Sequence, residues 1–111
     1  MKTIDEDIRS GQFQNVYLLY GSENYLKQQY KNKLKQALSA PGDHLNVTRF
    51  EGRGANPLAI IDLAETMPFL AEYRLILIED SGFFKSGCEE LAKYLPEIPP
   101  ATIIIFVESE I

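Results

Sequence analysis

A glycine and a lysine stand at the spacing of a phosphate-binding loop. In the pattern G-x-x-x-x-G-K-[ST], backbone amides surround the phosphates, the lysine contacts them, and the Ser or Thr holds magnesium. When the pattern starts at Gly21, Lys27 takes the lysine position. However, Leu26 replaces the second glycine and Gln28 replaces the Ser or Thr. These replacements oppose phosphate binding, because a leucine side chain stands where the backbone must approach the phosphate.

Acidic residues complete the comparison with nucleotide-binding sites. The apolar tract 75–78 is followed by Glu79 and Asp80, which resembles the strand end that holds magnesium in P-loop enzymes. The order Glu then Asp is the reverse of the usual one in the AAA+ class. Glu23 further places a negative charge at the positive end of a helix, where an anion would otherwise bind.

We therefore expect a degenerate nucleotide site with no catalytic residue, no metal and no cofactor. Its members are Gly21, Ser22, Glu23, Lys27, Glu79 and Asp80. One alternative stays open, a small P-loop ATPase that uses Lys27 with Glu79 and Asp80. Lys27, Lys31 and Lys35 also share one helix face by their spacing. Such a stripe is typical of a solvated face, although it could also contact DNA or an acidic partner.

Composition limits the classes of protein. The 111 residues are 45% hydrophobic and 24% charged, which suits one domain with one core. A net charge of -5 argues against broad nonspecific binding of nucleic acid by this domain alone, so any such binding would have to be local. The single cysteine, Cys88, excludes an internal disulfide framework and favours a reducing compartment, so we expect a cytoplasmic protein. We expect neither a signal peptide nor a membrane span, because residues 1–6 lack an apolar run and the longest apolar run is too short to span a bilayer.

Four short apolar tracts alternate with segments of helical spacing. The strands are expected at 16–20, 45–50, 73–78 and 102–107, and their lack of polar alternation is typical of strands buried on both faces. Helices are expected at 3–10, 22–39, 56–67 and 86–95, with Leu58, Ile61, Ala64 and Met67 as the buried stripe of the third. The pattern predicts an α/β fold, a three-layer sandwich with a mostly parallel sheet, and the phosphate-loop spacing from Gly21 suits a P-loop NTPase type with a degenerate nucleotide site.

Several tracts together resemble a known family. They are Val16-Tyr17-Leu18-Leu19-Tyr20-Gly21-Ser22-Glu23-Asn24-Tyr25-Leu26, Met67-Pro68-Phe69-Leu70 with Arg74-Leu75-Ile76-Leu77-Ile78, Leu91-Ala92-Lys93-Tyr94-Leu95, and Pro99-Pro100. Their order and spacing resemble the N-terminal domain of the delta subunit of bacterial DNA polymerase III, a part of the clamp loader. The resemblance implies an AAA+ architecture that has lost its ATP site, which agrees with the defects above.

The resemblance also implies a function and partners. A delta subunit binds the ring-shaped sliding clamp (beta) and helps to open it during DNA replication, while other subunits handle ATP. Its implied partners are the clamp and, in the full-length protein, the gamma/tau and delta prime subunits, with DNA reached only through the assembled loader. The chain itself would not be an enzyme but a non-catalytic subunit of a DNA-directed DNA polymerase holoenzyme, a nucleotidyltransferase complex.

The resemblance further implies a domain boundary. Residues 1–111 would form a single N-terminal AAA+-like domain, and the lid and collar domains of the family are absent from them. The sequence ends soon after an apolar strand, with no helix following to cover it. We expect a fragment that stops before the last strand of this domain.

A turn is the expected clamp contact. The family inserts two adjacent hydrophobic residues into a pocket on the clamp, and the matching residues are Phe69 and Leu70, with Met67 and Pro68 beside them. The residues agree in kind, because Pro68 ends a helix and leaves two large apolar side chains on a turn. The alternative is that both side chains fold inward and cover the junction between helix and strand.

Overall fold

The computed structural model describes residues 2–20, 24–38, 46–52, 56–68, 71–81 and 89–108. The helices are α1 (Lys2–Ser10), α2 (Asn24–Leu38), α3 (Pro57–Ala64) and α5 (Glu89–Tyr94), followed by the 3-10 turn η1 (Leu95–Glu97). The strands are β1 (Val16–Tyr20), β2 (Val47–Glu51), β3 (Arg74–Glu79) and β4 (Thr102–Glu108). Gly21, Ser22, Glu23, Phe69, Leu70 and Cys88 lie outside the described residues.

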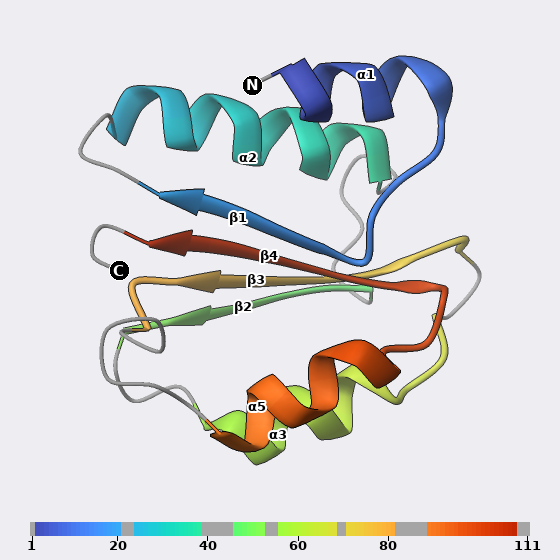
Figure 1. The fold of residues 1–111 in the computed structure, drawn as a ribbon, viewed down its shortest axis with the longest axis vertical. Helices are drawn as coiled ribbons and strands as arrows, with labels where there is room; N and C mark the ends of the chain where they lie inside the picture. Colours follow the sequence, from blue (N-terminus) through green and yellow to red (C-terminus); the bar gives the residue numbers. More distant parts are fainter. Residues whose placement is uncertain are drawn as a thin grey trace.

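The strands form one parallel sheet in the order β1-β4-β3-β2. β3 and β4 occupy its centre and are buried along their whole length. Figure 1 shows α1 and α2 over one face of the sheet and α3 and α5 over the other. The predicted fold class, an α/β sandwich of three layers, is therefore confirmed.

Alternate residues of the central strands supply two separate cores. Leu75, Leu77, Ile103 and Ile105 pack with Leu34 and Leu38 of α2 and Ile4 of α1. The residues between them, Ile76, Ile78, Ile104 and Phe106, pack with Ile60 and Ala64 of α3 and Leu91 of α5. A strand that is buried on both faces needs no polar alternation, which explains the continuous apolar tracts of the sequence.

The helix that precedes β3 differs from the prediction. The Asn56 side chain caps its first turn, accepting a hydrogen bond from the Leu58 N–H at 2.9 Å. However, α3 ends at Ala64 rather than at Pro68, and its buried residues are Ile60 and Ala64. Leu58 is 62% exposed and Met67 is 74% exposed, so their place in a buried stripe was wrong. Leu58 lies on the opposite side of the helix from Ile60, and Met67 lies beyond the helix end.

Two further bounds differ by a few residues. α1 begins at Lys2, one residue before its predicted start. β2 begins at Val47, two residues later than predicted. Within the described part of the chain, the helices are too short or too polar to cross a bilayer.

Candidate functional site

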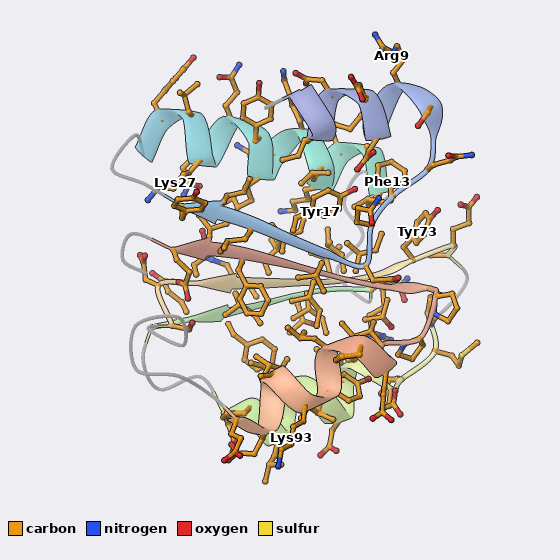
Figure 2. All side chains as sticks on the ribbon, viewed as in Figure 1. Arg9, Phe13, Tyr17, Lys27, Tyr73 and Lys93 are labelled. Atoms are coloured by element: carbon orange, nitrogen blue, oxygen red, sulfur yellow. The ribbon has the colours of Figure 1, made fainter. Side chains whose placement is uncertain are left out.

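The lysine at the phosphate-loop position faces inward. Lys27 lies on α2, is 3% exposed, and its Nζ donates a hydrogen bond to the main-chain oxygen of Glu108 at 3.4 Å. Figure 2 shows Lys27 on the side of α2 that faces the sheet. Its ammonium group therefore joins α2 to the end of β4.

Glu79, the last residue of β3, is held by two cations. Lys31 Nζ lies 3.1 Å from one carboxylate oxygen, and Arg49 Nε donates to the other. Arg49 also contacts Glu51 at 2.9 Å. Burial alone would raise the pKa of Glu79, but the hydrogen bonds from Arg49 and Lys31 and their positive charges outweigh it, so the pKa is lowered. Glu79 is ionised at neutral pH, and both of its oxygens are engaged.

The neighbouring acidic residues serve the backbone. Asp80 adopts a left-handed conformation with φ 51°, and its N–H donates to Val107 O at 2.9 Å. Glu108 is buried, and its carboxylate accepts hydrogen bonds from the Ser81 N–H at 2.9 Å and from the Ser81 hydroxyl. Sequence reasoning overlooked Glu108, although an acidic residue directly after the fourth apolar strand was a signal for it.

The carboxyl edge of the sheet thus collects the described members of the predicted nucleotide site. Lys27, Glu79 and Asp80 all lie there, while Gly21, Ser22 and Glu23 lie outside the described residues. The solvated interpretation of the lysine stripe is wrong for Lys27 and Lys31, because both reach the sheet. Among the residues that the structure describes, no cluster of three or more His, Cys, Asp or Glu could hold a metal ion.

A second candidate site lies at the other edge of the sheet, in the turn that follows α3. Met67 is strongly exposed and Pro68 is partly buried. Arg74, the first residue of β3, is 6% exposed; its Nε donates to Thr66 O at 2.8 Å and its Nη2 donates to Met67 O at 3.1 Å. The backbone of this turn is therefore attached to the sheet while the Met67 side chain faces solvent.

The end of α3 has further partners. Thr102 Oγ1, at the start of β4, donates to Ala64 O at 2.7 Å. The Tyr94 hydroxyl of α5 donates to Glu65 Oε2 at 2.6 Å, and burial together with this contact raises the pKa of Tyr94. Two strands and a helix therefore fix the position at which the chain leaves α3.

Comparison with solved structures agrees with this architecture. A Bacillus subtilis DNA clamp loader delta protein superposes with a TM-score of 0.85 at 24% identity, covering 96% of this chain and 34% of that one. A DNA polymerase III gamma subunit-related protein from Thermotoga maritima gives a TM-score of 0.74 at 14% identity, covering 96% of this chain and 39% of that one. At these identities the likeness concerns the fold.

Comparison of sequences goes further. The DNA polymerase III subunit delta of Bacillus subtilis (strain 168) is 27% identical over 114 residues, which cover 92% of this chain and 32% of that protein. This chain therefore spans about a third of the length of the relatives it matches. The family model described as DNA polymerase III, delta subunit, matches residues 17–110. Because that match includes most of the sequence and both candidate sites, the chain belongs to the DNA polymerase III delta subunit family.

Proposed function

We propose that this chain is the N-terminal domain of a clamp-loader delta subunit and that it acts in DNA replication by binding the sliding clamp. It contributes no polymerase or ATPase chemistry and works as a non-catalytic part of the polymerase holoenzyme. Family membership supports the assignment to the loader. The observation that carries the clamp contact is the turn after α3, where an exposed apolar Met67 stands on a backbone tied to the sheet.

The clamp contact consists of Met67, Pro68, Phe69 and Leu70. Phe69 and Leu70 follow Pro68 directly in the sequence and are the two anchors that fill a pocket on the clamp. An aromatic and an aliphatic side chain suit this role, because large apolar side chains that fill a partner's pocket dominate the binding energy of many interfaces. Binding here would help to open one interface of the ring.

The nucleotide site serves the structure of the domain and does not hydrolyse ATP. Lys27 donates to the backbone of β4, and Glu79 is neutralised by Lys31 and Arg49. Binding of Mg-ATP would require these contacts to break, and Leu26 and Gln28 would still stand where the loop needs Gly and Ser or Thr. The alternative is an ATPase based on Lys27, Glu79 and Asp80. Lys27 and Glu79 already make contacts within the domain, which is evidence against it.

In the full-length subunit, the remaining two thirds of the length would supply the lid and the collar. Those parts would join the gamma/tau and delta prime subunits, and DNA would be reached only in the assembled loader. Residues 1–111 act in this proposal as one AAA+-like domain that presents its clamp-contact turn to the beta ring.

Clamp binding is tested with the full-length subunit and purified sliding clamp from the same organism. The Phe69→Ala, Leu70→Ala double variant is expected to lose clamp binding and to keep its unfolding midpoint. Leu58→Ala is the matched control, because Leu58 is an exposed apolar side chain at the opposite end of α3 from the turn. A double variant that binds like the wild type, or a wild type that does not bind, would overturn the clamp contact.

Nucleotide binding is tested separately by calorimetric titration of millimolar ATP and magnesium into the same protein. We expect no heat of binding and no phosphate release. Saturable heat that disappears in Lys27→Met would support the ATPase alternative and refute the inert site.

A further inference from the structure

We infer that Arg74 positions the clamp-contact turn: its guanidinium binds the carbonyls of Thr66 and Met67, and so fixes the backbone that directly precedes Pro68, Phe69 and Leu70 in the sequence. This inference rests on the proposed clamp contact. It adds a residue that does not touch the clamp itself but acts through the turn.

The chemistry of a helix end explains why an arginine is needed. Thr66 and Met67 follow Ala64, the last residue of α3, so the regular hydrogen bonds of the helix do not include their carbonyls, and these need donors from elsewhere. Arg74 offers two donors in a rigid planar fork, and the two bonds at 2.8 and 3.1 Å satisfy adjacent carbonyls just beyond α3. Because Arg74 is almost fully buried, these bonds are screened little by solvent.

The backbone of Arg74 is itself held in the sheet. Its N–H donates to Ala101 O at 2.8 Å, and it pairs with Thr102 in the register of the two central strands. Since Thr102 also holds Ala64 O, adjacent strand starts hold the end of α3 at two successive points. The turn is therefore attached to the most buried part of the sheet and not only to its own helix.

Met67 has a fixed backbone but an exposed side chain, which suits a residue that is presented to a binding partner. The Met67 carbonyl is bound at 3.1 Å, whereas its side chain is 74% exposed. Exposure alone does not mark an interface, since Leu58 is exposed as well, and what distinguishes Met67 is the bound backbone beneath its side chain. A fixed backbone with an outward apolar group removes the ordering cost of an interface before the partner arrives.

The test compares clamp affinity among variants of the full-length subunit, measured well below their unfolding midpoints. Arg74→Met keeps the apolar stem and removes the donors, and it is expected to weaken clamp binding about tenfold, which corresponds to about 1.4 kcal/mol. Arg74→Lys keeps a charge and a donor and should recover part of this loss. It also serves if Arg74→Met does not fold.

The control separates positioning from general destabilisation of α3. Thr102→Val removes the donor to Ala64 O, on the same helix end, without touching Thr66 or Met67. We expect it to lower the unfolding midpoint while its clamp affinity stays within about twofold of the wild type. Equal weakening in Thr102→Val and Arg74→Met would overturn the positioning role.

A double-mutant cycle measures the coupling between Arg74 and Leu70 in clamp affinity, which a purely structural role of Arg74 would not produce. In the Leu70→Ala background, Arg74→Met should cost less affinity than in the wild type, because both act on one contact. Full additivity, or wild-type affinity in both Arg74 variants, would refute the role of Arg74 while leaving the clamp contact intact. Failure of wild-type binding, or of the Phe69 and Leu70 effect, would refute the clamp contact itself.

Discussion

The Lys27 ammonium group donates a hydrogen bond to the main-chain oxygen of Glu108, with an Nζ to O distance of 3.4 Å, and so joins α2 to the end of β4. In a P-loop enzyme, the lysine at this position reaches the β- and γ-phosphates. Here the same sequence position supports the fold. The difference can be measured directly.

Lys27→Met is expected to lower the free energy of unfolding by about 1–2 kcal/mol, because a buried acceptor loses a charged donor. Urea unfolding of the variant and the wild type gives this value. Lys93→Met is the control, because Lys93 makes an exposed ion pair with Glu89 and should change stability by less than about 0.5 kcal/mol. Equal stability of Lys27→Met and the wild type would contradict the structural role.

Glu79 should make stability depend on acid. Its pKa is lowered below the ordinary 4.5 in the folded state, so its contribution is complete above about pH 5 and disappears as pH falls through the folded pKa. Glu79→Gln removes the carboxylate that Lys31 and Arg49 share, leaving Arg49 only its exposed pair with Glu51, and should be about 1–3 kcal/mol less stable at pH 7.

The difference between Glu79→Gln and the wild type should shrink as pH falls toward 3, which unfolding curves across this range would show. Glu89→Gln is the matched control, since the Glu89 side chain is 81% exposed and its pair with Lys93 is weak. A difference that stays constant with pH would show that the carboxylate charge of Glu79 does not stabilise the fold.

Tyr17 should make the stability of the fold depend on pH in the alkaline range. Its hydroxyl donates to Asp7 Oδ2 at 2.7 Å and accepts from the Gln14 N–H at 2.9 Å, which joins β1 to α1. Burial and the Asp7 contact raise its pKa from 10.0 to about 12. Because the neutral phenol is favoured in the folded state, its contribution is complete below pH 10 and disappears as pH rises through about 12.

Tyr17→Phe should therefore lose about 1–2 kcal/mol at neutral pH and show a shallower alkaline loss of stability than the wild type. Ultraviolet titration should lack one late-ionising tyrosine in this variant. Tyr25→Phe provides the comparison, since Tyr25 is largely exposed and its replacement should leave stability unchanged. An alkaline unfolding curve that Tyr17→Phe does not alter would contradict the link between β1 and α1.

The strands could be predicted from the sequence because burial on both faces leaves a local signal. Val16–Tyr20 matches the predicted bounds, and the strands that begin at Arg74 and Thr102 differ from theirs by one residue. The face that α3 buries could not be predicted, because it depends on where the helix packs against the sheet and not on its own apolar residues. Leu58 is as apolar as Ile60, yet only Ile60 meets the core.

The ion pairs of Glu79 could not be predicted from the sequence either. Lys31, Arg49 and Glu79 come from three elements that meet only when the sheet has formed, so the lysines were interpreted as a solvated stripe. Arg74 gave no sign of its partners, since its guanidinium reaches back across the turn to α3. The expected clamp contact at Phe69 and Leu70 came from the family resemblance together with Pro68, and it stays a prediction.

Met67 and Ile60 form a matched pair that separates binding from folding. Ile60 is fully buried on α3, so Ile60→Ala should reduce the free energy of unfolding by about 2–5 kcal/mol. Met67→Ala should change it by less than about 0.5 kcal/mol, because the side chain is mostly in solvent. Clamp affinity should follow the opposite order: Met67→Ala weakens it severalfold, and folded Ile60→Ala retains it. Thermal unfolding and clamp titration of both variants would test this, and a strongly destabilised Met67→Ala with unchanged clamp affinity would place Met67 in the core and not at the interface.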